Sequence, residues 1–346
     1  MHLLGGRSLP SRRRSRAALA AALAAAGILC AACGSSTSPA THPATARKAK
    51  VSGSADVAYA GSLQLLDDKV MGPAFSRATG YGYEGRGGGS FGVAREILAG
   101  EISPNVFESI GGAPIALLEP KLTSWYVQVA ASPIVLAYNP KSSFAPQLRA
   151  IAEGRRPVRD LFSLMEEPGF HLGRTNPETD PQGQAFVEMV ELARTRYHLP
   201  ADTVDRVLGR LDNPAQVFAE TALEARLQSG QLDAASAFLS QAVQLHLPYV
   251  SLPSEINFGD PSLASGYAAA TLTLTGGRTV HGVPLVLDAT VLGNHDRPAA
   301  SAFVAYLLSA AGRDELRRGG YRLVTPRLVG DASAAPEEVR HELASS

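Results

Sequence analysis

The sequence predicts an α/β fold, because segments with strand character alternate with segments of helical character from Ala55 onward. Two of the expected strand-to-helix junctions carry a glycine followed by a serine, at Gly61-Ser62 and at Gly89-Ser90. A long apolar run over residues 125–138 is interrupted by Pro133, which suits a chain that leaves one lobe and enters another. We therefore expect largely parallel sheets flanked by helices.

The bulk composition argues against several classes of protein. The chain has 346 residues, in which 32 Lys and Arg balance 32 Asp and Glu, whereas nucleic-acid-binding proteins normally carry a basic excess. Its two cysteines, Cys30 and Cys33, lie in the N-terminal apolar segment. The body therefore has no disulfide and no cysteine metal site, and the eight histidines do not follow metal-ligand spacing.

Residues 1–33 have the pattern of a secretory signal peptide. Five arginines between Arg7 and Arg16 precede the uncharged, alanine-rich segment 17–29. That segment is shorter than the roughly 20 apolar residues of a membrane-spanning helix. The arginine run also resembles a twin-arginine signal, and a plain positively charged region explains it equally well.

The end of this segment resembles a bacterial lipobox, Leu29-Cys30-Ala31-Ala32-Cys33-Gly34, with Cys33 as the lipidated residue. Cys30 departs from the leucine usual at its position, and simple cleavage after an Ala-x-Ala-like site is the alternative. Residues 34–54 are rich in Ser, Thr, Ala and Pro and are expected to form a flexible tether. The predicted location is the outer face of the cytoplasmic membrane, with a lipid anchor at Cys33.

The remaining elements are expected in a regular order, with a hairpin at residues 271–280 and a frayed tail with some helix at residues 331–346. The expected strands cover residues 56–59, 81–84, 105–110, 125–138 with its break, 170–174, 232–238, 249–252, 285–292 and 321–324. The expected helices cover residues 63–77, 91–100, 115–121, 158–165, 184–197, 216–229 and 298–311.

The two Gly-Ser turns are candidate anion sites, because the first amides of a helix lack partners within the helix. Ser62 and Ser90 are expected to be N-caps. A flexible connection is the alternative for the glycine run 85–89. Asp180-Pro181 is a strong helix start, with Asp as the cap and Pro in the first helical position. Asp180 can therefore be a cap, a ligand-binding residue, or both.

At this point an ordered set of motifs resembles the molybdate/tungstate-binding proteins of ABC importers, specifically their archaeal-type tungstate-binding branch. The resemblance runs from about residue 56 to about residue 330. The motifs are Tyr59-Ala60-Gly61-Ser62-Leu63, Gly89-Ser90, Trp125-Tyr126-Val127, Ile134-Val135-Leu136-Ala137-Tyr138, Asn176-Pro177 with Asp180-Pro181 and Gly183, Leu227-Gln228-Ser229-Gly230 with Leu232-Asp233, and Leu252-Pro253-Ser254-Glu255-Ile256-Asn257.

This resemblance implies a periplasmic-binding-protein fold of the type with two chain crossings. Lobe I would comprise residues 55–131 and 285–330, and lobe II residues 132–284. The implied function is capture of a tetrahedral oxyanion, molybdate or tungstate, in the cleft and its delivery to an ABC permease and its ATPase. The implied protein is a monomer that needs no cofactor and is not an enzyme.

The resemblance also implies how the anion is held. In the tungstate-binding branch two carboxylates bind the metal centre of the anion and raise it to six-coordination. Asp180 falls at the first of these positions, so it would meet a metal only through bound molybdate or tungstate. The second position falls at Ala237, which cannot ligate, and this departure leaves the identity of the anion open. The expected ligand-binding residues are Gly61, Ser62, Gly89, Ser90, Asp180, Gln182, Gly183 and Phe238.

Three other functions compete with this interpretation. Gly293-Asn294-His295-Asp296 matches a signature of two-metal phosphoesterases, but the Asp-x-His that such enzymes also need is missing. An exposed turn before the helix at Pro298 is the alternative for this motif. A hydrolase with Ser62 or Ser90 as nucleophile lacks the Gly-x-Ser-x-Gly pattern. A sensor that binds the oxyanion without transporting it also stays open.

Overall fold

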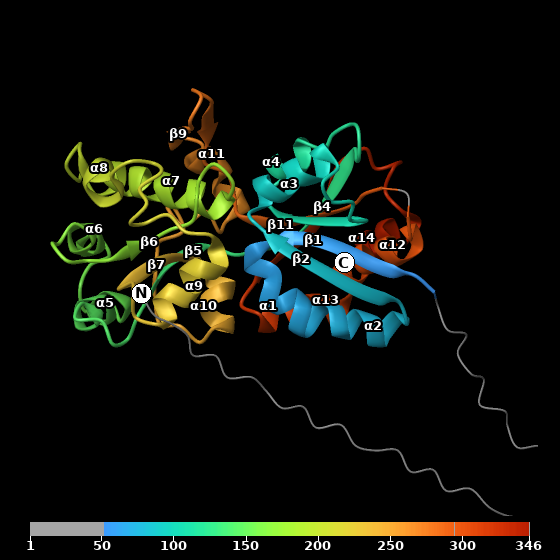
Figure 1. Cartoon of the computed structure of the whole chain (residues 1–346), viewed down its shortest axis with the longest axis horizontal. Coiled ribbons are helices and arrows are strands. Elements are labelled where there is room, and N and C mark those ends of the chain that lie inside the picture. Colours follow the sequence, from blue (N-terminus) through green and yellow to red (C-terminus); the bar gives the residue numbers. More distant parts are fainter. Residues whose placement is uncertain (1–51, 294, 346) are drawn as a thin grey trace, which may run out of the picture. The chain divides into compact units, whose positions relative to one another are not determined.

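Two mixed β-sheets and one hairpin organise the part of the chain that the structure, a computed structural model, describes: residues 52–293 and 295–345 (Figure 1). All of these residues belong to one compact unit. The expected signal peptide, Cys33 and the tether up to residue 51 lie outside the described residues, and so does Asn294. Within the described residues, no helix combines the length and apolar character needed to span a membrane.

Lobe I is the part of the chain around a six-stranded sheet with the order β12-β4-β11-β3-β1-β2. Its strands are β1 (Ser54–Ala60), β2 (Gly82–Gly88), β3 (Val106–Ile110), β4 (Trp125–Ala131), β11 (Val286–Val291) and β12 (Arg322–Gly330). Its helices are η1 (Gly61–Leu63), α1 (Gln64–Leu66), η2 (Asp67–Met71), α2 (Gly72–Thr79), α3 (Ser90–Ala99), α4 (Ala113–Ala116), α12 (Arg297–Leu308), α13 (Ala310–Arg318) and α14 (Glu337–Ser345).

Lobe II is the part of the chain around a four-stranded sheet with the order β6-β7-β5-β8, together with the hairpin of β9 and β10. Its strands are β5 (Ile134–Tyr138), β6 (Leu172–Gly173), β7 (Ala234–Phe238), β8 (Tyr249–Ser251), β9 (Thr271–Thr273) and β10 (Thr279–His281). Its helices are α5 (Ala145–Ala152), α6 (Asp160–Met165), α7 (Pro181–Arg196), α8 (Thr203–Leu208), α9 (Glu220–Gln228), α10 (Leu239–Gln244), η3 (Pro261–Leu263) and α11 (Ala264–Tyr267).

The chain passes between the two sheets twice, at neighbouring places. β4 ends at Ala131 and β5 begins at Ile134, so the break predicted at Pro133 is confirmed. The return passage runs from the hairpin into β11. The two passages lie side by side, because the amide of Ser132 donates to the carbonyl of Leu285 at 3.1 Å. Paired crossings of this kind form a hinge.

Antiparallel pairing dominates both sheets, so the expectation of mainly parallel sheets was wrong. Only the β1–β2, β1–β3 and β6–β7 pairs are parallel among the described strands of the two sheets. The strands that carry the chain to and from the other lobe, β4 and β11, pair antiparallel with each other. Such strands enter the sheet from the hinge rather than through a crossover helix, so the rule that alternating strands and helices give parallel pairs does not apply to them.

The glycine run before Ser90 is strand and not turn, which corrects the sequence prediction. β2 continues to Gly88 and pairs with β1 along its whole length. A Cβ added at Gly85 or Gly87 would approach the ring of Tyr59 to 2.8 Å or 2.7 Å. The glycines are therefore explained by packing, because they let the Tyr59 ring lie across the edge strand.

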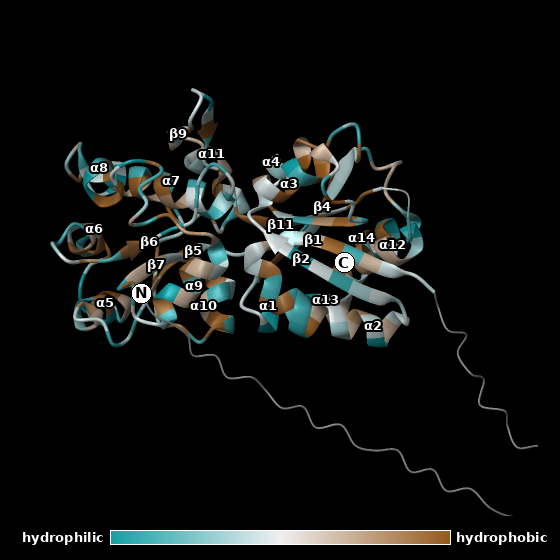
Figure 2. Cartoon of the chain, viewed as in Figure 1, coloured by the Kyte–Doolittle hydropathy of each residue, from teal (hydrophilic) through white to brown (hydrophobic). Residues whose placement is uncertain are grey.

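Apolar side chains line the strands and the inner faces of the helices, as the brown strands of Figure 2 show. The C-terminal residues also contribute to this core. Helix α14 packs against α12 and buries Val339 completely. The helix expected within the tail is present at residues 337–345, but it is packed rather than frayed, because its apolar residue Val339 joins the core.

Candidate functional site

A small cavity lies where loops of the two lobes meet, with a volume of about 210 Å³. Drug-sized ligands need about 300–1,000 Å³, so the cavity suits a small ligand. Among the described residues, no lysine, arginine or histidine lines it. The lining residues are Gly61, Gln64, Gly87, Gly88 and Gly89 from lobe I and Thr175, Asn176, Thr179, Asp180, Phe218, Ala219, Glu220 and Thr221 from lobe II.

The turn at Gly61 forms the lobe I wall of this cavity. Helix η1 begins at Gly61 with Ala60 in the N-cap position, so the expectation that Ser62 is an N-cap was wrong. The Ser62 hydroxyl is buried and has no hydrogen-bond partner among the described residues. The backbone N–H of Ser62 hydrogen-bonds to the carboxyl group of Glu220 from lobe II. This turn therefore holds a carboxyl group in the structure, which is the interaction expected for an anion.

The second Gly-Ser junction, at the start of α3, makes a contact between the lobes. Gly89 rather than Ser90 is the N-cap of α3. The amides of Phe91 and Gly92 donate to the carbonyl of Thr179 at 3.1 Å and 3.2 Å. The Ser90 hydroxyl accepts a hydrogen bond from the amide of Ile110 at 3.3 Å. Two of the helix amides are therefore used to hold lobe II in place rather than being left for a ligand.

Asp180 lies directly after Thr179 and lines the cavity as expected. It is the N-cap of α7, with Pro181 first in the helix, and its Oδ1 accepts from the amide of Gln182 at 2.8 Å. Its side chain is almost fully buried. Burial raises the pKa of Asp180 to about 6, although the amide of Gln182 favours the ionised form. The carboxyl group is therefore largely ionised at neutral pH.

Glu220 is a cavity residue that the sequence did not lead us to expect. The predicted helix over 216–229 begins only at Glu220, so this side chain stands at the edge of the cavity. It reaches across to lobe I, where a Cβ added at Gly61 would overlap its Oε2 atom. Burial and the neighbouring Asp180 raise the pKa of Glu220 well above its ordinary range. A second carboxyl group therefore faces the first across the cavity.

The structure does not place a second carboxylate near Ala237. Ala237 lies on β7 and packs in an apolar cluster with Val135 and Leu223. Because side chains alternate along a strand, it faces away from Ser236, whose hydroxyl points toward the polar network behind the cavity. Ala237 therefore offers no ligand to the cavity, and the second carboxyl group that lines it comes from Glu220.

Five of the predicted residues do not line the cavity: Ser62 and Ser90, described above, and Gln182, Gly183 and Phe238, which lie behind it. Gln182 is fully buried and donates to Glu220 Oε1 at 3.2 Å. Gly183 lets α7 pack on the preceding loop, because a Cβ there would come within 2.6 Å of the Thr175 carbonyl. Phe238 is buried in the main apolar core, and its amide donates to the side chain of Gln241.

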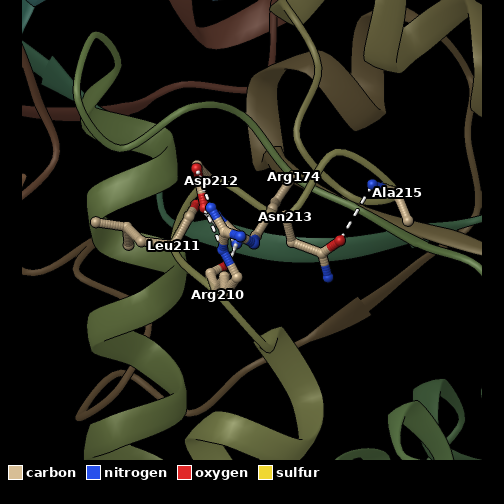
Figure 3. Close-up of polar contacts among 6 residues, drawn as sticks. All are labelled: Arg174, Arg210, Leu211, Asp212, Asn213 and Ala215. Carbon is tan, nitrogen blue, oxygen red and sulfur yellow. Dashed lines mark hydrogen bonds and ion pairs between the residues drawn. The ribbon is translucent and has the colours of Figure 1, made fainter.

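A buried arginine joins the two segments that carry Asp180 and Glu220 (Figure 3). Arg174 lies after β6, and its amide donates to the carbonyl of Gln216 at 2.8 Å. Its Nη2 atom donates to the carbonyls of Arg210 and Leu211 at 2.9 Å and 3.0 Å. Burial lowers the pKa of Arg174 to about 10. These bonds fix the loop before α9 against the loop before α7, which brings the two acids together.

The phosphoesterase-like motif lies far from this cavity. Asp296 accepts weakly from the amide of Ser54, at the start of β1, whereas Gly61 follows the end of β1. Asp296 occupies the N-cap position of α12 without a side-chain capping bond. In the described part of the chain, no group of three or more His, Cys, Asp or Glu side chains could hold a metal ion.

A small cleft between two lobes that are joined by paired crossings defines the class of two-lobed binding proteins that close on a solute. Comparison with known proteins gives the particular family. The chain belongs to the bacterial extracellular solute-binding proteins, whose family profile matches residues 55–322. This family consists of solute-binding proteins of transporters and not of enzymes. The prediction that the protein is not an enzyme is therefore confirmed, and the phosphoesterase and serine hydrolase alternatives are removed.

Individual relatives agree with this assignment. A Haloferax volcanii protein provisionally named an ABC transporter molybdenum-binding protein is 34% identical over 278 residues, covering 79% of this chain and 83% of that protein. The molybdate/tungstate-binding protein WtpA of Pyrococcus abyssi is 28% identical over 244 residues, covering 65% of this chain and 69% of that protein.

A solved structure confirms the fold class. The periplasmic molybdate-binding protein of Azotobacter vinelandii matches with a TM-score of 0.51 at 17% identity, covering 78% of this chain and 98% of that chain. The predicted periplasmic-binding-protein fold is therefore correct, with the pairing of its strands corrected as described above.

Proposed function

We propose that this protein captures molybdate or tungstate in the cleft between its lobes and delivers it to an ABC permease and its ATPase. One observation carries the proposal. Two carboxyl groups, Asp180 and Glu220, share a small cavity with backbone amide donors, and no described cationic side chain lines that cavity. The names of the relatives that bind molybdenum, molybdate or tungstate support the same ligand class.

The two carboxylates decide which oxyanion fits. The central atoms of sulfate and phosphate cannot take a carboxylate as a further ligand, and sulfate, which carries no proton at neutral pH, is simply repelled by it. Molybdenum and tungsten in their tetraoxoanions accept additional oxygen ligands. We assign Asp180 and Glu220 to this role, so that four oxo groups and two carboxylate oxygens surround the metal of the bound anion.

The remaining predicted residues supply neutral donors and the support behind them. The hydroxyl of Ser62, which is buried without a partner beside the cavity residue Gly61, would donate to an oxo group from the lobe I side. Gly89 would shape the wall where α3 meets lobe II, with Ser90 buried behind it. Gln182, Gly183 and Phe238 would hold the acids in place from behind. Binding would stabilise the closed arrangement of the lobes about the hinge.

The proposal includes the location of the protein in the cell. The family is extracellular, and the lipobox-like end of the signal segment supports an anchor at Cys33. We propose a monomer that is held on the outer face of the cytoplasmic membrane by this lipid and by the tether up to residue 54. Globomycin, which blocks lipoprotein signal processing, should cause accumulation of the unprocessed chain. Release of a soluble protein in its presence would contradict the anchor.

Isothermal titration calorimetry of the purified protein tests the ligand class. We expect one equivalent of molybdate or tungstate to bind, with much weaker binding of sulfate and phosphate. Calcium chloride is the control for a cleft that uses its two acids to hold a cation. No heat from any of the four oxyanions, or heat from calcium alone, would overturn the proposal.

A further inference from the structure

The carboxyl group of Glu220 is held from one side by side-chain amides. Gln241 Nε2 donates to Glu220 Oε1 at 2.9 Å, and Gln182 Nε2 donates to the same atom at 3.2 Å. The other oxygen, Oε2, lies at Gly61 on the opposite wall. Because both side-chain amides bind one oxygen, the second oxygen is the one turned toward lobe I.

Gln241 is the centre of the network that sets this orientation. Its Nε2 also donates to Glu224 Oε1 at 2.7 Å. Its Oε1 accepts from Gln182 Nε2 and from the Phe238 amide, each at 2.8 Å. Ser236 extends the network by donating to Gln182 Oε1 at 2.8 Å.

These contacts leave the Gln241 side chain a single favourable orientation. Both of its N–H donors and both lone pairs of its oxygen are used. A reversed amide would place its oxygen against the carboxyl groups of Glu220 and Glu224. It would also turn its N–H groups toward two other N–H donors. Gln241 is almost fully buried, so water cannot replace these bonds.

We propose that Gln241 is a positioning residue that presents one oxygen of Glu220 to the cleft and thereby sets the preference for molybdate and tungstate over sulfate and phosphate. This inference rests on the proposed function. A fixed carboxylate oxygen adds a bond to molybdenum or tungsten, but it cannot bond to sulfur or phosphorus and it repels sulfate. A Glu220 side chain that could rotate away would lose the bond to molybdenum or tungsten and would no longer repel sulfate.

The test compares Gln241→Met with the matched control Gln244→Met in the purified protein. Gln244 lies on the same helix, α10, and donates to the Gly319 carbonyl at 2.9 Å. Calorimetry measures molybdate affinity, and competition against molybdate measures sulfate affinity. The molybdenum K-edge spectrum adds a coordination signature, because its pre-edge peak is intense for four-coordinate molybdate and weak for a six-coordinate centre.

We expect Q241M to lower molybdate affinity about 10- to 100-fold, to leave sulfate affinity equal or higher, and to strengthen the pre-edge peak. Q244M should match the wild type in all three readouts. Where circular dichroism shows that Q241M is unfolded, Gln182→Met carries the same expectation, because it removes the other donor to Glu220 Oε1.

Three outcomes would overturn the inference. The first is a Q241M protein whose affinities and pre-edge peak match those of Q244M. The second is lower molybdate affinity with an unchanged weak pre-edge peak, since that pattern shows a structural role alone. The third is a wild-type complex with an intense pre-edge peak, in which carboxylate ligation is absent although molybdate binds. Failure of the wild type to bind any oxyanion is distinct, because it overturns the proposed function and this inference with it.

Discussion

Two pairs of facing acids are found among the buried acids of the described residues, and one of these pairs lies where a ligand can reach it. Asp180 and Glu220 line the cleft, whereas Asp67 on η2 and Glu108 on β3 are fully buried inside lobe I. Burial raises the pKa of every one of these carboxyl groups. Burial of two acids therefore does not distinguish a binding site from a structural pair.

The difference lies in the groups that surround each pair. In the cleft, side-chain and backbone N–H groups donate to Asp180 and Glu220. Inside lobe I, Asp67 and Glu108 face each other, and none of their four carboxyl oxygens has a hydrogen-bond partner among the described residues. Burial therefore favours the neutral form of this pair without any donor to offset it. The cleft pair is held in place by donated hydrogen bonds beside a cavity, whereas the lobe I pair has neither donors nor access to a ligand.

The largest expected effect comes from neutralising the cleft pair. The double variant D180N/E220Q should lose molybdate affinity by about 100-fold or more, because it removes both carboxylate ligands. Sulfate affinity should stay equal or rise, because repulsion is relieved. The matched double variant D67N/E108Q should bind molybdate like the wild type. Calorimetry on the wild type and the two double variants measures these affinities. Equal molybdate affinities of the two double variants would contradict the claim that only the cleft pair binds the ligand.

The next effect concerns the pH dependence of folding stability. The pKa of Glu108 is raised from 4.5 to about 7, first of all by burial. Between these values the unfolded chain releases a proton that the folded chain keeps, so the stability contributed by this group falls as pH rises through the window. The glutamine of the Glu108→Gln variant cannot ionise. The free energy of unfolding of this variant should therefore rise by about 2 kcal/mol relative to that of the wild type when the pH is raised from 5 to 8. Urea unfolding of both proteins at pH 5 and pH 8 measures this change. If the stability difference between variant and wild type were the same at both pH values, the claim that Glu108 is kept neutral in the folded protein would be contradicted.

A smaller effect is expected from adding one methyl group to the lobe I wall. In Gly61→Ala the new Cβ would overlap Glu220, so the closed cleft must open slightly. We expect molybdate affinity to fall roughly tenfold, because overpacking costs about 1–3 kcal/mol. Gly266→Ala is the control, since a Cβ there meets no atom within 4 Å. Equal affinities of the two variants would show that Glu220 does not need to approach Gly61.

The smallest effect separates the two serines of the Gly-Ser junctions. Ser62→Ala removes a buried hydroxyl without a partner and should weaken molybdate binding by about 1 kcal/mol, with little change in stability. Ser90→Ala should weaken molybdate binding by a similar amount. It also removes the acceptor for the Ile110 amide, so it should in addition lower the free energy of unfolding by about 1 kcal/mol. Thermal unfolding and calorimetry on both variants measure these effects. A larger loss of stability in S62A than in S90A would reverse this assignment.

Sequence reasoning worked where the chemistry is local. The proline at 133 predicted the passage between the sheets, and Asp180-Pro181 predicted both a helix start and a cavity residue. Each of these features depends on the backbone preferences of one or two residues. The ordered motifs gave the family for the same reason, since they mark a succession of turns.

Sequence reasoning failed where a residue gains its role from a distant partner. Glu220 looked like one acid among several on a helix, and the bonds of Arg174 and Gln182, which bring its segment beside Asp180, are invisible in the sequence. The glycine run before Ser90 resembled a loop because the Tyr59 ring that requires it is invisible in the sequence. The position of Glu220, an acid in the first turn of α9, was the one signal that pointed to it.

The central claim is that Asp180 and Glu220 bind the metal of the captured oxyanion. The molybdenum K-edge spectrum of the wild-type protein with one equivalent of molybdate tests it most directly. The claim predicts a weak pre-edge peak and an added shell of light-atom ligands, as for a six-coordinate centre. The intense pre-edge peak of free four-coordinate molybdate, observed with molybdate fully bound, would contradict it.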